Sequence, residues 1–246
     1  KTRLFLQVLC VSGLIFVSDV YIQSLGNLFG FGELMLGLWG IPFTIFCVVG
    51  IMNAFNMIDG INGLCASICL ICFVALIYII NANNIPILFP LILPVGAIVG
   101  FLMYNLGILG DRTVFLGDSG SNSLGFLCAW ILIYFSNIES SIITPATALW
   151  LVAIPFVDAV GVISSRILNK LKVLNSHRDH IHHKMLNIKL SAEWVFSILI
   201  LVSGLLAYIG LFFNKNYPDQ GYYSFYAFVI FSICYYLAVR RITPNV

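Results

Sequence analysis

The sequence predicts an all-α, polytopic integral membrane protein that forms a single domain over residues 1–246. Apolar residues make up 61% of the chain, charged residues 9%, and the mean hydropathy is +1.02. Soluble domains carry roughly 25% charged residues, so this composition excludes a soluble globular domain. The apolar residues fall in eight runs, each close to the roughly 17–25 residues that a helix needs to cross ~30 Å of hydrocarbon. Barrel-type alternation is absent, and backbone groups in lipid need internal partners, so helices are expected.

The order of these runs defines the expected topology. The predicted spans are 3–21, 38–55, 64–81, 86–104, 122–136, 145–165, 194–213 and 222–239. Eight spans place the N-terminus, the loops at 56–63, 105–121 and 166–193, and the C-terminal tail on one side of the membrane. We take this arrangement as about eight transmembrane helices.

The basic residues support this topology and orient it. Eleven of the twelve Lys and Arg residues share one side, and Lys215 alone lies on the other. Cytoplasmic loops carry the Lys and Arg excess, so the shared side is predicted to be cytoplasmic. Trp39 and Trp194 stand at the starts of spans, as interfacial aromatic residues do. The eleven are Lys1, Arg3, Arg112, Arg166, Lys170, Lys172, Arg178, Lys184, Lys189, Arg240 and Arg241.

The seven cysteines lie inside or at the ends of the apolar runs, so a disulfide framework is not expected. Cys65, Cys69 and Cys72 share one face of a predicted helix at i, i+4 and i+7. Cys69 and Cys72 form a CxxC, but only Leu and Ile separate them. We therefore interpret these residues as helix packing, with a metal or redox site as the alternative.

Three polar clusters interrupt the apolar sequence: NAFNMIDGING at 53–63, FLGDSGS at 115–121, and RDHIHHK at 178–184. Each has a plain structural alternative, because Asn, Asp, Gly and Ser are also the usual turn residues between helices. All three clusters fall on the predicted cytoplasmic side, and few carboxylates lie elsewhere. This shared position indicates parts of one site.

Asp59 and Asp118 are the candidate metal-binding carboxylates. No basic residue lies between Leu4 and Asp111, so Asp59 has no local cation, and an unpaired carboxylate beside hydrocarbon is costly and usually functional. Mg²⁺ is typically held by one or two carboxylates together with substrate phosphates. Asp118 is the better ligand candidate because small residues around it let backbone amides and a diphosphate approach.

The window 177–183 contains all four histidines of the chain. On a helix, His180 and His183 would share a face, and with Arg178 and Lys184 they would form an anion site suited to phosphate. A zinc site is one alternative, although HExxH is absent. A basic segment that binds anionic lipid is another.

Asp158 and Asp19 are carboxylates within apolar runs. A carboxylate at the centre of a span costs about 2.5–3.5 kcal/mol on insertion scales. We expect Asp158 to face a cavity or to support other site residues, with burial against a helix as the alternative. Asp19 is expected to be solvated near the other membrane surface.

The motifs NAFNMIDGINGL, FLGDSGS and RDHIHH, in this order and on this topology, resemble those of the polyprenyl-phosphate N-acetylhexosamine-1-phosphate transferases, closest to their WecA-type bacterial branch. The resemblance runs from about residue 1 to 241. It includes NLGILG at 105–110 and TPATALWLVAIPFVD at 144–158.

This resemblance implies transfer of N-acetylglucosamine 1-phosphate from UDP-N-acetylglucosamine to undecaprenyl phosphate, giving the lipid diphosphate sugar and UMP. It places the reaction on the cytoplasmic side of the bacterial inner membrane, as the first membrane step of O-antigen or related glycan synthesis. The implied cofactor is Mg²⁺, with Mn²⁺ as an alternative. The lipid bilayer is a partner and nucleic acid is not. The oligomeric state is left open, a homodimer included.

The resemblance also implies roles for individual residues. Asp59, Asp118 and His180 would be catalytic, with Asp118 as the metal ligand. The implied substrate-binding residues are Asn53, Asn56, Asn62, Arg178, His182 and His183.

Three departures from the family pattern stand out. Position 62 is Asn where the family often has a second Asp, and His177 precedes Arg178 where an acidic residue is common. An acidic DDxxD-type motif is expected just upstream of residue 1. The chain is therefore expected to be a fragment that lacks upstream helices and holds part of the catalytic set.

Three alternative functions differ from this one in specific features of the sequence. The related phosphotransferase that uses UDP-MurNAc-pentapeptide in peptidoglycan synthesis is the close alternative, although its histidine loop differs from RDHIHH. A CDP-alcohol phosphotransferase needs several further acids near its Asp-Gly, whereas the next acid after Asp59 is Asp111. A proton-coupled transporter would place ionisable groups near midplane, whereas most lie at one surface here.

Overall fold

The computed structural model describes residues 2–82, 89–110, 114–137, 142–170 and 180–242. Within these ranges the regular elements are helices, and one antiparallel bridge joins Ser24 to Met35. The predicted all-α class is confirmed. The elements are α1 (Thr2–Ser18), η1 (Gly37–Trp39), α2 (Gly40–Ile58), α3 (Leu64–Ala82), α4 (Phe89–Asn105), α5 (Gly117–Asn137), α6 (Pro145–Leu151), α7 (Ala153–Leu168), α8 (Ile181–Asn187), α9 (Ala192–Asn216) and α10 (Gly221–Ile242).

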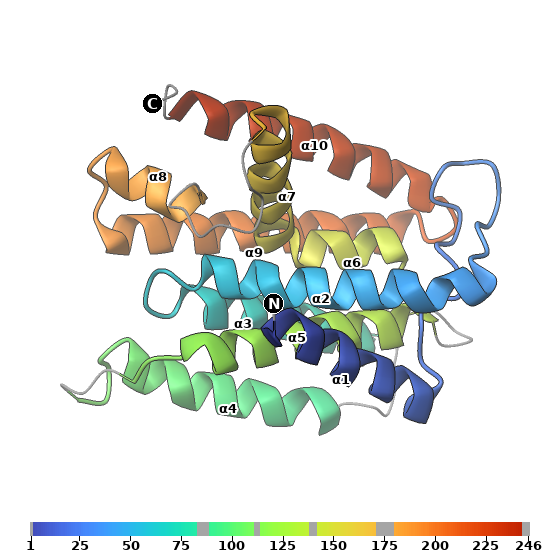
Figure 1. The fold of residues 1–246 in the computed structure, drawn as a ribbon, viewed down its shortest axis with the longest axis horizontal. Coiled ribbons are helices and arrows are strands. Elements are labelled where there is room, and N and C mark those ends of the chain that lie inside the picture. Colours follow the sequence, from blue (N-terminus) through green and yellow to red (C-terminus); the bar gives the residue numbers. More distant parts are fainter. Residues whose placement is uncertain (1, 83–88, 111–113, 138–141, 171–179, 243–246) are drawn as a thin grey trace.

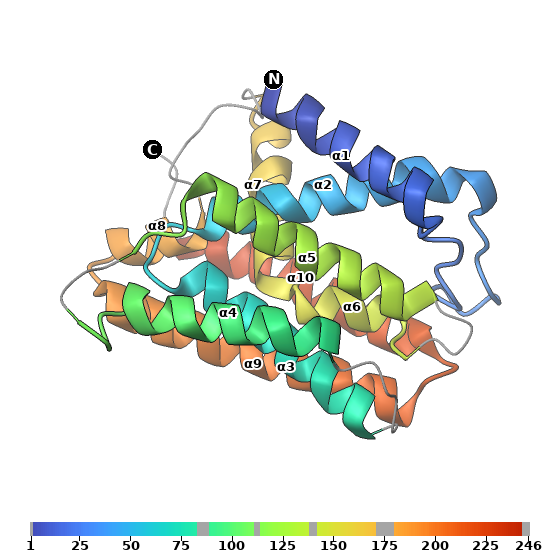
Figure 2. The same cartoon turned by 90° about the horizontal axis from the view of Figure 1, so that it is seen from below.

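The helices agree with a multi-pass membrane protein, but the predicted number of eight spans is not confirmed. Among the described residues, four segments are long and apolar enough to cross a membrane as single helices: 37–58, 64–81, 192–216 and 221–242. The apolar helices at 2–18 and 91–105 are shorter. Figures 1 and 2 show that α2, α3, α4, α5, α9 and α10 run along a common direction.

The prediction of one continuous span over 145–165 is wrong. The chain bends by 86° between α6 and α7, at Val152. Pro155 explains the break, because it has no N–H to donate to the carbonyl of Leu151 and its ring would clash with that carbonyl. Figure 1 shows α7 standing across the other helices. The break carries Asp158, on the second turn of α7, toward α8 and α10.

Helix α5 begins earlier than predicted, at Gly117 rather than after residue 121, so the GDSGS sequence forms its first turn. It packs closely against α2 because Gly125 has no side chain. A Cβ there would lie 2.9 Å from Cα of Met52 and 3.0 Å from Cβ of Phe55. This close approach brings the end of α2 beside the start of α5.

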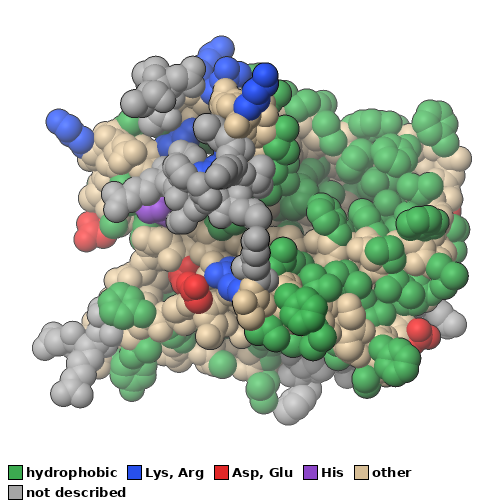
Figure 3. Space-filling model, in the orientation of Figure 1, with side chains coloured by type: hydrophobic (Ala, Val, Ile, Leu, Met, Phe, Trp, Pro, Cys, Tyr) green, Lys and Arg blue, Asp and Glu red, His purple; other side chains and the backbone are tan. Residues whose placement is uncertain are grey.

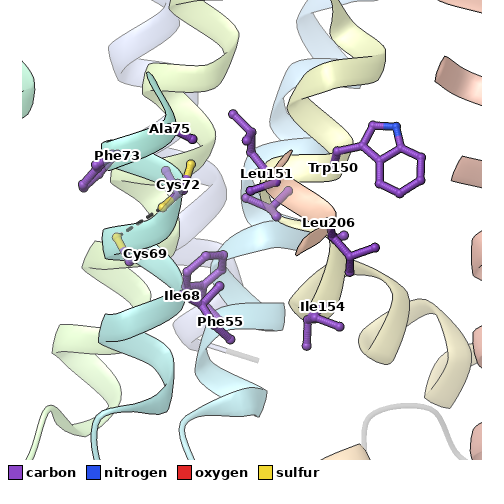
Figure 4. Close-up of a cluster of buried hydrophobic side chains, with 14 of the residues drawn as sticks. Phe55, Ile68, Cys69, Cys72, Phe73, Ala75, Trp150, Leu151, Ile154 and Leu206 are labelled. Carbon is purple, nitrogen blue, oxygen red and sulfur yellow. Dashed lines mark hydrogen bonds between the residues drawn. The ribbon is translucent and has the colours of Figure 1, made fainter. Parts of the chain in front are cut away.

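The core is built mainly around α3, as Figure 4 shows for side chains from α2, α3, α6, α7 and α9. Cys65, Cys69 and Cys72 are fully buried there, and Sγ of Cys69 lies 3.2 Å from Sγ of Cys128 on α5. The cysteines therefore pack between helices, as their spacing suggested. Figure 3 shows that charged and histidine side chains gather mostly at the end where α8 lies, whereas the rest of that face is largely hydrophobic.

Candidate active site

The loop between α2 and α3 forms one wall of a pocket. Helix α2 ends at Ile58, and Asp59 leaves the helical conformation at ψ 50°. Gly63 turns the chain at φ +75°, a conformation that glycine adopts without a Cβ penalty. The pocket has a volume of about 310 Å³, and both Asp59 and Asn62 line it.

Asp118 forms the facing wall of the same pocket. Gly117 enters α5 at φ +66°, and Asp118 then sits in the first turn of this helix. Carboxylates and phosphates are stabilised at helix N-termini, where backbone N–H groups are unpaired. The Asp118 side chain is 81% exposed, so a ligand can reach both carboxylate oxygens.

Arg3 links Asp118 to the end of α2. Its guanidinium lies 3.2 Å from Oδ2 of Asp118 and donates to the side-chain oxygens of Asn53 at 3.2 Å and Asn56 at 2.7 Å. Asn56 also donates to Oδ1 of Asp118 at 3.2 Å and to the Ser121 hydroxyl at 2.9 Å. Asn53 and Asn56 therefore hold Arg3 and Asp118 in place through side-chain contacts.

Arg3 was predicted from the sequence only as a cation on the cytoplasmic side, and Gln7 was not identified. Gln7 is buried, accepts a hydrogen bond from Asn53 at 3.0 Å and donates to Asn122 at 2.7 Å. The sequence contained a pattern that could have identified them, because Arg3 and Gln7 are four residues apart and so share a face of α1. Two strongly polar side chains on one face of an apolar helix indicate a polar surface behind it.

The histidine window differs from the predicted helix. His180 adopts an extended conformation at the N-cap of α8, so His180 and His183 do not share a helix face. His180 is buried, and its Nδ1 lies 2.7 Å from Oδ2 of Asp158. Asp158 is itself 3% exposed, and it lies buried against α8 and α10 with its carboxylate on His180. Arg178 lies outside the described residues.

His182 faces the loop that carries Asp59. A Cβ on Gly60 would overlap the His182 imidazole, so only glycine allows this contact. The His182 ring stacks 8° from parallel with His180 at 6.1 Å and lies 4.1 Å from the His183 ring. Both ring nitrogens of His182 are buried and have no hydrogen-bond partner among the described residues. An unsatisfied buried polar group costs about 1–3 kcal/mol.

Two pKa shifts describe the electrostatics of this region. Burial, followed by the charge of Asp118, raises the pKa of Asp59 from 3.8 to about 6. Burial, followed by the neighbouring His183, lowers the pKa of His182 from 6.5 to about 4. Burial therefore disfavours the ionised form of Asp59, and His182 is a neutral imidazole at neutral pH. His182 therefore adds no positive charge to the predicted anion site at neutral pH.

Two further pocket residues were not identified from the sequence. Phe115 lines the pocket with a side chain that is 72% exposed, and Asn105 lines it from the end of α4. Asn105 donates to the Val114 carbonyl, while its buried Oδ1 has no partner among the described residues. An exposed aromatic ring and an amide oxygen without a partner in one pocket suit a planar ligand that can donate a hydrogen bond.

The chain is similar to several curated bacterial proteins that are named as transferases. The chain is 34% identical over 213 residues to the undecaprenyl-phosphate alpha-N-acetylglucosaminyl 1-phosphate transferase of Yersinia pestis, covering 86% of this chain and 58% of that protein. It is 32% identical over 227 residues to the protein of the same name from Escherichia coli (strain K12), covering 90% and 61%. The Haemophilus influenzae protein of that name is 35% identical over 149 residues, covering 60% and 41%.

The chain spans about 60% of the length of the first two of these curated relatives. Residues 1–136, more than half of the chain, match the family described as Glycosyl transferase family 4. This match contains both aspartates of the pocket, together with Arg3 and its amide partners. The chain belongs to glycosyl transferase family 4.

Proposed function

We propose that this chain carries the site of a phosphotransferase that moves N-acetylglucosamine 1-phosphate from UDP-N-acetylglucosamine to undecaprenyl phosphate, releasing UMP. The observation that carries this proposal is the pairing of Asp59 and Asp118 across one pocket, with Arg3 on Asp118 and His182 behind Asp59. Phosphoryl transfer needs acids for metal and donors for phosphate, held in fixed positions. The names of the relatives supply the acceptor, undecaprenyl phosphate, and the transferred group, N-acetylglucosaminyl 1-phosphate, while the donor follows from the family resemblance.

The donor set of the pocket fits Mg²⁺, with Mn²⁺ as the alternative. Asp118 would be the principal ligand and Asp59 the second, since hard divalent cations prefer carboxylate oxygens and tolerate one or two of them when substrate phosphates complete the shell. The pKa of Asp59, raised by burial and then by the charge of Asp118, fits this role, because a bound cation would offset both penalties on the ionised carboxylate. Bound Mg²⁺ would neutralise charge on the diphosphate during transfer.

Arg3 and the histidines would bind the phosphates. Arg3 carries the formal charge, and its guanidinium suits phosphate oxygens because it presents several donors in a plane. His182 would contribute a neutral N–H, since its lowered pKa excludes the imidazolium form at neutral pH. A phosphate oxygen would satisfy one of its two unpartnered ring nitrogens.

The nucleoside would lie between Phe115 and Asn105. Base stacking on an aromatic side chain contributes about 1–3 kcal/mol, and Phe115 offers an exposed ring in the pocket. Uracil has one ring N–H, which the unpartnered Oδ1 of Asn105 could accept. A pocket of about 310 Å³ lies at the lower end of the range for small-molecule sites.

The proposal includes the side of the membrane on which the pocket lies. The pocket, α8 and the ends of α9 and α10 lie at one end of the molecule, where the cations gather (Figure 3). Under the positive-inside rule this end faces the cytoplasm of the bacterial inner membrane, where nucleotide sugars are found. The product would then feed synthesis of a cell-surface polysaccharide such as O-antigen.

The test is a transfer assay on the full-length protein that contains this chain. Labelled N-acetylglucosamine phosphate should reach undecaprenyl phosphate with Mg²⁺ and not in its absence, and UDP-MurNAc-pentapeptide should not serve as donor. Asp118→Asn should remove turnover, whereas Asp219→Asn, in the exposed loop before α10, should retain it. Transfer from UDP-MurNAc-pentapeptide alone, or full activity in Asp118→Asn, would overturn the proposal.

A further inference from the structure

Asp158 is an acceptor at the centre of three helices. Its Oδ2 lies 2.7 Å from Nδ1 of His180, and its Oδ1 accepts from the backbone N–H of Ile181 at 2.9 Å and the hydroxyl of Tyr235 at 3.1 Å. The side chain belongs to α7, while its partners come from the start of α8 and from α10. A carboxylate in so buried a position is stable only when its oxygens are satisfied in this way.

These contacts determine which nitrogen of His180 carries a proton. An ionised carboxylate can only accept, so each of its three partners must donate. The proton of His180 on the Asp158 side is therefore on Nδ1, and Nε2 is the ring nitrogen directed away from Asp158. A partner on one imidazole nitrogen sets the tautomer and the ring orientation of the other.

His180 is connected to the acidic pocket through His182. The two rings are almost parallel at 6.1 Å, and His182 rests against Gly60, the residue after Asp59. Lys184 adds a second link between α8 and α10, since its Nζ donates to the carbonyl of Val239 at 3.4 Å. A change in the orientation of His180 would therefore be transmitted to the loop that holds Asp59.

We infer that Asp158 and Tyr235 are positioning residues that hold His180 so that its Nε2 addresses the diphosphate of the sugar nucleotide; this inference rests on the proposed function. In contact with a phosphate oxygen both ring nitrogens act as donors: Nδ1–H donates to Asp158 and Nε2–H donates to the phosphate. The ionisable groups described around His180 are Asp158 on α7, Tyr235 on α10, and His182 and His183 on α8. Tyr235 holds Asp158 and does not itself reach the substrate.

Asp158→Asn is the sharp test because it keeps the shape of the side chain and changes its hydrogen-bonding pattern. Two donors face Oδ1 and one faces Oδ2, so the single amide oxygen should occupy the Oδ1 position. The amide NH₂ then points at Nδ1 of His180, which must accept, and the ring proton moves to Nε2. The ¹⁵N NMR signals of the labelled His180 side chain should report this exchange of protonated nitrogen.

The kinetic readout separates positioning from a general structural role. In the full-length enzyme, Asp158→Asn should raise KM for UDP-N-acetylglucosamine and change kcat less, because the neutral ring of the variant meets the diphosphate without a positive charge. We expect a rise of about 10- to 100-fold, the range known for loss of a partner behind a metal-binding histidine. Tyr235→Phe removes one hydrogen bond to Asp158 and should raise the same KM up to about tenfold. Tyr236→Phe is the matched control, since the described residues show no hydrogen bond from it to Asp158, and its KM should match wild type.

Each outcome decides the inference or the proposed function separately. An active wild type whose KM is unchanged in both Asp158→Asn and Tyr235→Phe would overturn the positioning role. If Asp158→Asn does not fold, Tyr235→Phe and the NMR signals of wild-type His180 decide it, and a wild-type ring without a proton on Nδ1 would refute it. A wild type that binds and transfers no sugar nucleotide would refute the proposed function, while the NMR result would still test the Asp158–His180 contact.

Discussion

Replacement of Asp59 with asparagine tests whether the pocket is short of positive charge before a metal binds. The substitution keeps the size of the side chain and removes its charge. Burial and the facing Asp118 both disfavour the ionised form of Asp59, and its pKa is raised from 3.8 to about 6. Ionised Asp59 therefore destabilises the metal-free fold at neutral pH, and Asp59→Asn should be more stable than wild type there.

The size of the effect follows from the pKa. A tenfold change in a protonation equilibrium corresponds to about 1.4 kcal/mol, so a rise from 3.8 to about 6 corresponds to about 3 kcal/mol. Asp59 is only partly buried, and water screens much of this penalty, so we expect about 1–2 kcal/mol. For a chain of this size, that corresponds to an increase of roughly 2–8 °C in the thermal midpoint.

The pH dependence of stability shows the direction of the Asp59 effect. Because the pKa of Asp59 is higher in the folded protein than in the unfolded chain, its neutral form contributes stability. This contribution is fully present below about pH 4 and is lost as the pH rises through 6. His182 has the opposite effect, because its pKa is lowered from 6.5 to about 4 and stability is lost as the pH falls through this window. The stability of wild type as a function of pH contains the effects of both Asp59 and His182. The informative quantity is therefore the difference in the free energy of unfolding between Asp59→Asn and wild type. This difference should grow from near zero at pH 4 to its full value at pH 7.

The assay is thermal unfolding of the full-length protein in detergent, from pH 4 to pH 8, with a chelator and then with Mg²⁺. Asp219→Asn controls for the loss of an exposed carboxylate and should stay within about 0.5 kcal/mol of wild type. Mg²⁺ should raise the midpoint of wild type more than that of Asp59→Asn. A variant that is equally stable or less stable at pH 7 without Mg²⁺, or a difference independent of pH, would refute the electrostatic reasoning.

Three further predictions concern the contacts around the pocket. Gly60→Ala should remove most transfer activity because its methyl group would displace His182, whereas Gly204→Ala, which has open space, should retain activity in the same assay. Arg3→Gln should weaken binding of UDP-N-acetylglucosamine about tenfold in calorimetry through loss of the positive charge of Arg3 beside Asp118, yet change stability by less than about 1 kcal/mol because the ion pair is exposed; equal losses in Lys215→Gln would contradict this. Gly125→Ala should lower the free energy of unfolding by about 1–3 kcal/mol through overpacking of α2 against α5, and a denaturation midpoint like that of wild type would refute the close packing.

Local properties of the sequence predicted much of the fold. Composition and the length of the apolar runs led to the all-α membrane class, because transfer of apolar side chains and backbone groups into lipid depends on each segment separately. The break before α7 was missed even though its cause, Pro155, is local. A proline inside an apolar run does not by itself show whether the helix kinks, as the intact α4 with Pro94 demonstrates.

The identities of most candidate-site residues were predicted from the sequence, but the residues that contact them were not. Asp59, Asp118 and the histidines are conspicuous in an apolar chain, because a charge near hydrocarbon is costly without a function. Arg3 meets Asp118 across 115 residues, and His182 meets Gly60 across more than a hundred. Contacts of this kind depend on how helices pack, which no local pattern of residues specifies.

The sequence by itself therefore determined the membrane environment, the helical class and the kinds of chemical group at one surface, since these follow from the transfer free energies of individual segments. Only the tertiary structure decided that Asp118 pairs with Arg3, that His180 leaves the helix to bind Asp158, and that His182 is buried and neutral. The physical reason is that charge state, tautomer and hydrogen-bond partner depend on burial and on neighbours from distant helices, and packing alone brings these together.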